Sequence, residues 1–356
     1  MDNIKRSRNL AVMQQHEVID TSSSLYSGTY SDYDDRWDLK KFKKQLEMHV
    51  IRCDNTEMEF DIISIDPSIV NAFRRILLSE VPSMAIEKVF MYNNTSVIPD
   101  EVLAHRLGLI PLKADPRKFE YRQEGDLHGT EQDTLEFELK VRCSWNPDKS
   151  AESTDPDELY INHKVYSTHL KWIPIGTQGH LFRASDVGPT VGDVSRLLTP
   201  TEKKGVLINK LRPGQELDMK LHAVKGIGKD HAKFSPVATA FYRLLPDIQL
   251  TRSVEGELAE KLQKCFSPGV ITLVEKNGKK VAKVHDARYD SCSRNVLRHE
   301  DLADCVQLGR VKDHFIFTIE SLGAMPPDAL FRESIRVLKG KCRKFLAEIN
   351  RGYGDA

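Results

Sequence analysis

Closely spaced carboxylates are the residues of this sequence that could hold catalytic metal ions. The D-x-D spacing occurs at Asp32-Tyr33-Asp34 and again at Asp155-Pro156-Asp157. A two-metal catalytic site needs carboxylates held rigidly around both ions, and D-x-D spacing is one way to supply them. Both pairs lie in polar runs that lack the apolar residues of a rigid frame. We therefore predict solvated acids at both places and no catalytic residue in the chain.

The six cysteines are the other potential metal ligands or nucleophiles, and they stand at positions 53, 143, 265, 292, 305 and 342. No C-x2-C pair occurs, whereas structural zinc and iron–sulfur clusters need closely spaced thiolates. Scattered cysteines without an export signal also indicate reduced thiols rather than a disulfide framework. We predict free thiols, no bound metal and no cofactor. The alternative is a stand-alone α+β enzyme that uses Cys265 with a histidine, which no spacing supports.

A glycine-containing run from Lys225 to Pro236, KGIGKDHAKFSP, is a candidate phosphate-binding loop. A P-loop would need glycine where Ala223 stands and Ser or Thr where Asp230 stands, so the spacing excludes it. Lys229 and His231 could instead contact a large protein partner from a basic loop. A plain solvated turn is the alternative interpretation.

Composition limits the possible partners. The chain has 356 residues, enough for two compact domains. Lys plus Arg equals Asp plus Glu at 52 each, so no bulk positive field draws the surface onto nucleic acid. No apolar run approaches the roughly 20 residues of a membrane span, and the N-terminus lacks the apolar core of a signal peptide. We expect an intracellular protein with no autonomous nucleic-acid binding and no membrane contact.

A helix that begins at Pro67 must position the first group of candidate residues. Asp66 can accept bonds from the first-turn amides, and proline favours the first helical position. Asn71 and Arg75 lie roughly opposite the apolar arc of this helix, with Arg74 on its flank. These polar groups could bind a partner, and a solvated charged face is the alternative. The arc itself consists of Ile69, Val70, Phe73, Ile76 and Leu77 at helical spacing.

A second amphipathic helix is predicted over residues 327–350. Its apolar positions repeat every 3.5 residues on average, which is typical of a helix that lies along another helix. Six such residues at about 1.5 to 3 kcal/mol each contribute roughly 9 to 18 kcal/mol on burial. Association itself costs roughly 4 to 15 kcal/mol, so the seam alone does not guarantee a stable complex. The Pro67 helix must therefore contribute to any stable complex. The seam consists of Phe331, Ile335, Leu338, Cys342, Phe345 and Ile349.

The rest of the chain alternates between strand patterns and loops. Residues 42–65 predict two strands, and 237–250 and 311–320 predict strands that return to them. Short strand-like runs between Asp-, Pro-, Ser- and Gly-rich loops predict an inserted, mostly-β domain. The tyrosines of the polar N-terminus could dock on a neighbouring protein, with a disordered tail as the alternative. The predicted parts are a flexible tail over 1–36, a main domain over 37–85 plus 233–350, an insert over 86–232 and a tail over 351–356.

Two stretches resemble a known family. They are NAFRRILL at 71–78, followed by Val81-Pro82 and Ala85-Ile86-Glu87, and DEVLAHRLGLIP at 100–111. Their residue order resembles the signature of the α-like assembly subunits of DNA-dependent RNA polymerases, which include the bacterial α N-terminal domain and its archaeal counterpart. Within that family the chain is most similar to the larger α-like subunit shared by eukaryotic RNA polymerases I and III. The resemblance extends from about Tyr30 to the last helix.

This resemblance implies an α+β fold in which an α-like dimerisation domain is interrupted by the insert. It implies that a smaller α-like subunit binds Ile69, Phe73, Ile76, Leu77, Phe331, Ile335, Leu338, Cys342, Phe345 and Ile349. It further implies that the large catalytic subunits assemble on Asn71, Arg74, Arg75, His105, Arg106, Lys229 and His231. Such a scaffold would be non-catalytic and would serve rRNA, 5S rRNA and tRNA transcription in the nucleus, including the nucleolus.

The segment from Cys265 to Val270 resembles the start of a metal module that some relatives carry. The remaining ligands are missing here, so residues 253–310 are interpreted as a metal-free, ferredoxin-like remnant. The alternative within the family is an α-like subunit of RNA polymerase II or of an archaeal polymerase. Those relatives tend to keep clustered cysteines, so the scattered thiols argue against it.

Overall fold

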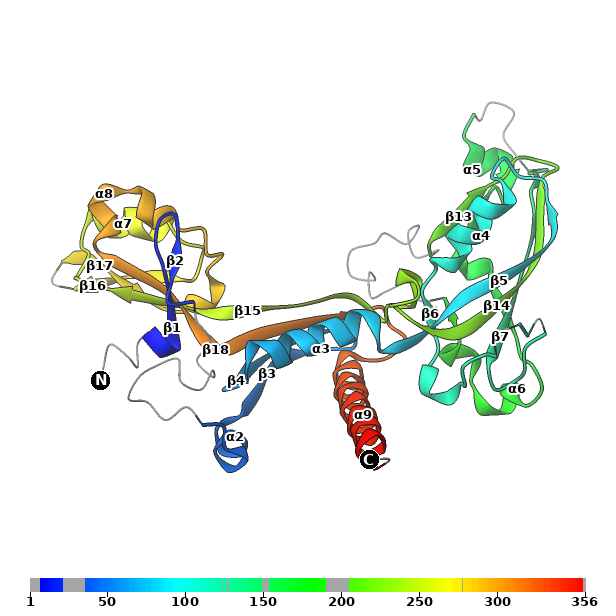
Figure 1. Ribbon diagram of the computed structural model, residues 1–356. Helices are drawn as coiled ribbons and strands as arrows, with labels where there is room; N and C mark the ends of the chain where they lie inside the picture. The colour runs from blue at the N-terminus through cyan, green and yellow to red at the C-terminus, as the bar shows by residue number, and fades with distance from the viewer. Residues whose placement is uncertain are drawn as a thin grey trace. The chain divides into compact units, whose positions relative to one another are not determined.

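The computed structural model describes residues 7–21, 36–123, 125–126, 128–148, 154–189, 205–276 and 278–354 (Figure 1). The chain forms two compact units. The first comprises Met1–Ile51, Glu59–Ala72 and Phe241–Thr318, and the second comprises Arg52–Met58, Phe73–Ala240 and Ile319–Ala356. The mixture of helices and sheets confirms the predicted α+β class. The predicted boundaries of insert and dimerisation domain do not coincide with these units, so that division stays a prediction.

The first unit contains a sheet with strand order β2-β1-β18-β4-β3, in which β15 also pairs with β18. The returning strands predicted near 237–250 and 311–320 are confirmed as β15 and β18. Of the two strands predicted over 42–65, the first begins only at Glu47, because a short helix, α2, precedes it. The elements are β1 (Leu10–Met13), β2 (Val18–Ile19), α2 (Leu39–Gln45), β3 (Glu47–Cys53), β4 (Glu57–Ile63), β15 (Val237–Leu250) and β18 (Val306–Ser321).

The N-terminal segment contributes two strands to this sheet. β1 pairs antiparallel with β18, with Leu10 opposite Val311, and β2 pairs with β1. Ala11 and Met13 of β1 are buried, and Met13 packs in a hydrophobic core of the first unit. The prediction of a flexible tail over 1–36 is therefore wrong for residues 10–19. The tyrosines at 26, 30 and 33 and the first D-x-D pair lie outside the described residues.

The predicted metal-free remnant packs into a small hydrophobic core of the first unit, to which Met13 of β1 and Ile248 of β15 also contribute. Cys265 and Cys305 are buried in it as free thiols, packed with Leu262, Val270 and Leu302. Among the described residues, no group of three or more His, Cys, Asp and Glu side chains could hold a metal ion. Its elements are α7 (Glu257–Lys264), β16 (Ile271–Lys276), β17 (Lys279–Val284), η7 (Ala287–Tyr289), η8 (Asn295–Arg298) and α8 (Glu300–Ala303).

The second unit is organised by a sheet with strand order β11-β7-β14-β5. β14 pairs antiparallel with both β5 and β7. The hydrophobic core of this unit includes Leu103, Phe137 and Leu221. Its strands are β5 (Pro82–Asn94), β6 (Leu112–Lys113), β7 (Thr134–Arg142), β8 (Ser144–Trp145), β9 (Tyr160–Ile161), β10 (Lys164–Tyr166), β11 (Lys171–Ile173), β12 (Gly188–Pro189), β13 (Leu207–Lys210) and β14 (Glu216–Ile227). Its short helices are α4 (Asp100–Gly108), η1 (Pro116–Lys118), α5 (Pro156–Leu159), η2 (Ser167–His169), α6 (Gln178–Leu181), η3 (Ala184–Asp186) and η6 (Ala232–Phe234).

Two longer helices complete the described chain. α3 (Pro67–Ser79) begins in the first unit and ends in the second, and α9 (Pro327–Gly354) belongs to the second. None of the helices in the described ranges combines the length and apolarity of a membrane span.

We expect a buried histidine to make the stability of the second unit depend on pH. His222 stacks edge-on against Phe90, and its Nδ1 lies 3.5 Å from an Arg122 nitrogen. Burial, and then the Arg122 charge, lower the pKa of His222 below its usual 6.5. The unfolded chain therefore binds a proton first, and stability should be complete above pH 6.5 and decline as pH falls below it. A His222→Gln variant should show a flatter fall of Tm between pH 7 and pH 5; an equally steep fall would contradict this assignment.

Candidate subunit interfaces

Helix α3 begins at the residue that its local sequence predicts. Asp66 Oδ1 accepts a hydrogen bond from Ser68 N at 2.8 Å, and Pro67 occupies the first helical position. Ile69 is exposed, but Ile76 and Leu77 are buried in the chain's own core. These two side chains were predicted to contact a partner, and the structure instead leaves them almost no surface for one. Periodicity cannot distinguish a partner helix from the chain's own strands.

The predicted seam on α9 divides into a buried start and an exposed end. Phe331 is only 6% exposed and packs edge-to-face on Phe73, with ring centroids 5.3 Å apart. Phe331 therefore supports the chain's own fold. Leu338 is half-buried, whereas Ile335, Cys342 and Ile349 are exposed and Phe345 reaches 69% exposure. Leu346, 59% exposed, extends the apolar surface beyond the strict 3.5-residue pattern, which is why that pattern missed it.

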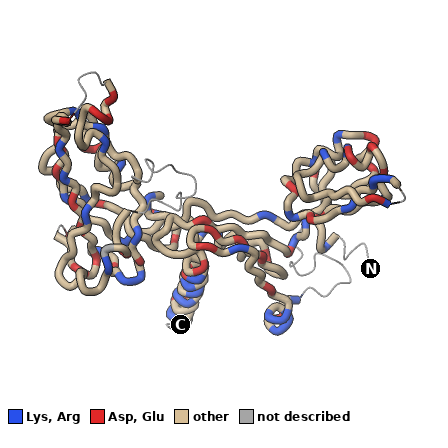
Figure 2. Tube along the Cα trace, turned by 180° about the vertical axis from the view of Figure 1, so that it is seen from behind, with Lys and Arg blue, Asp and Glu red and all other residues tan. Residues whose placement is uncertain are grey.

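The rest of the exposed part of α9 is basic. Figure 2 shows Lys and Arg along this helix, and Lys339, Arg343 and Lys344 are exposed there. Lys341 donates to both carboxylate oxygens of Glu80 at 2.7 and 2.9 Å. A partner that covers the apolar seam would thus meet positive charge at its margins.

The run KGIGKDHAKFSP packs closely against neighbouring residues and does not form a phosphate-binding loop. A Cβ on Gly226 would come within 2.7 Å of the Phe234 ring, and one on Gly228 within 2.4 Å of the Leu78 carbonyl oxygen. The backbone N–H of Lys229 donates to Ser79 O at 2.8 Å. Glycine is needed at both positions because the backbone passes so close to its neighbours. The run therefore fixes the exposed Lys229 side chain next to the end of α3.

Two of the predicted contact residues, His105 and His231, line the same hollow, which has a volume of about 250 Å³. His231 Nδ1 accepts from Lys233 N at 3.1 Å, which fixes the histidine at the start of η6. The Lys233 ammonium donates to Ile86 O at 2.9 Å and also pairs with Glu87. A hollow lined by two exposed imidazoles, a carboxylate and an ammonium group suits a polar protein side chain. The α4 hollow, as we name it, is lined by Ile86, Glu87, Val89, Ala104, His105, Gly108, Leu109, His231 and Lys233.

The other residues predicted to contact the large subunits differ in the bonds that they make within the chain. Arg106 donates from Nε to Ile208 O at 3.0 Å and from Nη2 to Leu207 O at 2.8 Å, so it holds β13 beside α4. Arg106 is nevertheless an exposed residue, and its role as a subunit contact stays a prediction. Asn71 and Arg74 are half-buried and have interactions of their own. Arg75 is exposed at the end of α3.

A second hollow, of about 350 Å³, contains Cys265 and His299, the residue types of the enzyme alternative. Burial raises the pKa of the Cys265 thiol, which disfavours the thiolate. A nucleophilic cysteine needs the opposite shift. The geometry thus gives the enzyme alternative no support.

Comparison with known proteins identifies the family. The RNA polymerase Rpb3/Rpb11 dimerisation domain model matches residues 59–342. The chain belongs to this RNA polymerase dimerisation family. It is 54% identical over 347 residues to the DNA-directed RNA polymerases I and III subunit RPAC1 of Homo sapiens, covering 98% of the chain and 97% of that protein. The corresponding protein of Saccharomyces cerevisiae is 48% identical, with 94% and 96% covered. The Arabidopsis thaliana DNA-directed RNA polymerases II, IV and V subunit 3 is 33% identical, with 80% and 85% covered.

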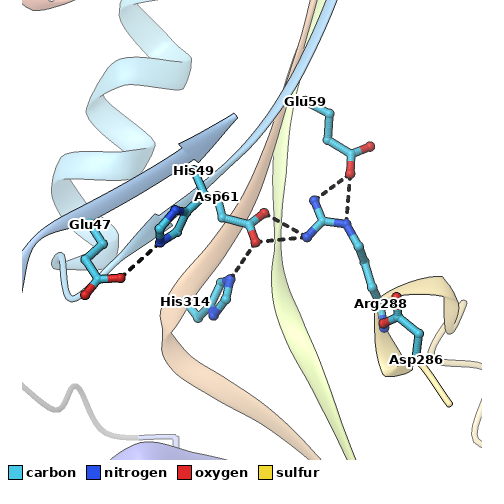
Figure 3. Close-up of polar contacts among 7 residues, drawn as sticks. All are labelled: Glu47, His49, Glu59, Asp61, Asp286, Arg288 and His314. Carbon is cyan, nitrogen blue, oxygen red and sulfur yellow. Dashed lines mark hydrogen bonds and ion pairs between the residues drawn. The ribbon is translucent and has the colours of Figure 1, made fainter. Parts of the chain in front are cut away.

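Sequence reasoning missed a charge cluster that this family member buries in its first unit (Figure 3). Arg288 donates from Nη1 to both oxygens of Asp61, at 2.8 and 2.9 Å, and from Nε to Glu59 at 3.0 Å. His314 Nε2 lies 2.9 Å from Asp61 Oδ2. Burial works to lower the pKa of Arg288, but the hydrogen bonds that Arg288 donates to Glu59 and Asp61 outweigh it and raise that pKa. The Arg288 cluster, as we name these four residues, joins the remnant to strands β4 and β18. Because 229 residues separate Arg288 from Glu59, no local pattern signals the pair.

The second D-x-D pair has a structural role. Asp155 accepts from Asp157 N and caps α5. Asp157 binds Lys164 at 2.7 Å and also contacts His163, and these hydrogen bonds lower the pKa of Asp157 to about 2. Both aspartates are exposed, as predicted, and in addition one caps α5 and the other forms a surface ion pair.

Proposed function

We propose that this chain is the larger α-like subunit shared by RNA polymerases I and III, and that it is a non-catalytic assembly scaffold. The observation that carries the proposal is the exposed apolar seam on α9 in a member of a dimerisation family. The 54% and 48% identities to subunits named for polymerases I and III support this choice. The 33% identity to a subunit of polymerases II, IV and V gives weaker support to the alternative, which is an α-like subunit of RNA polymerase II or of an archaeal polymerase.

In this proposal a smaller α-like subunit covers the seam first. Its contacts are the exposed Ile69, Ile335, Cys342, Phe345 and Ile349 and the half-buried Phe73 and Leu338. Ile76, Leu77 and Phe331 support them from inside the chain. A large aromatic side chain such as Phe345 is the type that dominates the energy of protein interfaces. The dimerisation domain comprises residues 37–85 and 233–350, and 86–232 form the insert.

The large catalytic subunits then bind the composite surface, through the α4 hollow, Arg75 and Lys229. These groups are exposed and lie on elements that backbone hydrogen bonds and close glycine contacts hold in place. The chemistry of transcription belongs to those subunits, which make rRNA, 5S rRNA and tRNA in the nucleus and nucleolus.

The deciding experiment is purification of the tagged chain from its own cells at moderate salt, with mass spectrometry of the proteins that accompany it. The proposal expects one small α-like protein together with the large subunits of both polymerases I and III. Recovery of polymerase II subunits alone would keep the family and overturn the assignment within it. Recovery of no polymerase subunit would overturn the scaffold function.

The α4 hollow gives a sharper prediction. A His105→Ala/His231→Ala double variant should keep the small partner but lose about tenfold in affinity for the large subunits, because contacts at the hollow lie outside the seam. His180, an exposed histidine of the same unit outside the hollow, provides the matched His180→Ala control. Quantitative pull-down of pre-formed heterodimer measures both steps. Equal recovery of large subunits by both variants would remove the hollow from the interface.

A further inference from the structure

A short basic helix, α2, is the strongest charged feature of the first unit that the proposed function does not use. Four of its seven residues are lysines, in the sequence Lys40-Lys41-Phe42-Lys43-Lys44. All four are exposed, and none has an ion-pair partner among the described residues. Figure 2 shows this concentration of positive charge on the small helix that leads into the sheet.

The helix is held almost only by local bonds. It has no buried residue, and its cap consists of Asp38, which accepts from the backbone N–H groups of Lys40 and Lys41. An isolated helix of this length is marginal in water because nucleation is costly. Opening α2 would therefore sacrifice no core packing.

The charge distribution also works against the helical state. Lys40 faces Lys43 and Lys44 at the i+3 and i+4 spacings, and like charges at these spacings repel. The first turn contains no acidic residue, so Lys40 and Lys41 lie unfavourably at the positive end of the helix dipole, whereas Lys43 and Lys44 lie in the last turn, where positive charge is favourable. An acidic partner would relieve both effects. Such a partner gains most when it takes the segment in an extended form and separates the lysines.

We propose that residues 40–44 are the docking segment for a nuclear import receptor, whose acidic groove reads lysine side chains along an extended chain. A lysine-rich run of five to eight residues is the known signal for such receptors and for nucleic-acid contact. We favour an import receptor over nucleic acid as the partner because Asp38 and Glu47 flank the positive run on both sides, and the whole chain has no net charge. Affinity for a phosphate backbone grows with the number of phosphates that cations neutralise, and this run supplies only four cations. This inference rests on the proposed nuclear function.

The test uses the full-length chain, tagged with a fluorescent protein and expressed in its own cells. The variant replaces all four lysines by glutamine: Lys40→Gln, Lys41→Gln, Lys43→Gln and Lys44→Gln. The matched control removes four exposed lysines from the β16–β17 hairpin: Lys276→Gln, Lys279→Gln, Lys280→Gln and Lys283→Gln. We expect the nuclear-to-cytoplasmic ratio to fall severalfold in the α2 variant only, while both variants still bind the smaller α-like subunit. An unchanged ratio in the α2 variant would overturn the proposal.

Purified proteins separate import from nucleic-acid contact. Affinity for a purified import receptor of the lysine-reading class should fall about tenfold or more in the α2 variant. Binding to a single-stranded RNA probe should be equally weak in wild type, variant and control. Loss of RNA binding with receptor binding intact would overturn the import role. Absence of polymerase subunits from the wild-type purification would instead overturn the proposed function, so the two failures are distinguishable.

Discussion

A Phe345→Asp variant should fail to pair with the smaller α-like subunit while its own fold stays intact. Phe345 is 69% exposed, so its replacement removes little packing within the chain. In the complex, the same change would put a carboxylate into an apolar seam and lose an aromatic anchor. Loss of such an anchor typically costs about 2 to 4 kcal/mol, or roughly 30- to 1,000-fold in Kd. Leu338→Asp, closer to the core, should act in the same direction.

Two controls make this result interpretable. Lys344→Gln lowers the charge of the neighbouring position by one, as Phe345→Asp does, but keeps the seam apolar, so the heterodimer should survive. Phe331→Asp should instead unfold part of the chain, because Phe331 packs on Phe73. Co-expression followed by size-exclusion chromatography measures pairing, and Tm measures the fold. Survival of the heterodimer in Phe345→Asp would show that α9 is not the interface.

Removal of Arg288 should be the most damaging single change within the first unit. Asp61 and Glu59 are 10% and 31% exposed, and Arg288→Met would leave both carboxylates without their shared counter-ion. Breaking a buried ion pair in this way costs about 3 to 5 kcal/mol. That loss is a large share of the roughly 5 to 15 kcal/mol that keeps a domain folded. Denaturant unfolding of the variant, with hydrogen exchange in β4 and η7, measures the loss and its location.

Rescue variants distinguish lost charge balance from lost packing. Adding Glu59→Gln and Asp61→Asn to Arg288→Met removes the orphaned charges and should restore much of the stability. Arg288→Lys keeps the charge but not the planar fork that reaches both carboxylates, so its stability should lie between wild type and Arg288→Met. If the triple variant is as unstable as Arg288→Met, packing rather than charge explains the effect.

Local signals predicted the helices α3 and α9 and the strands β15 and β18, because each depends on neighbouring residues. Asp66 and Pro67 start α3 as expected, and the spacing along α9 marks its exposed seam. Contacts distant in sequence were beyond such signals. The pattern that made Ile76 a partner contact is also the pattern of a core residue, and the sequence around Leu10 gives no sign that it pairs with Val311. For the same reason no local signal indicated that Arg106 binds the backbone of β13.

The edge strand β3 has a consequence for how much of this protein a cell can hold. β3 ends the order of its sheet, and each of its residues is exposed. An open strand edge is a template for pairing with other chains, and the exposed Val50 and Ile51 make this edge prone to aggregation. A newly made copy that finds no partner would carry both this edge and the bare seam of α9. We therefore expect surplus copies to be aggregated or degraded, so that supply of the smaller subunit sets the abundance of this one.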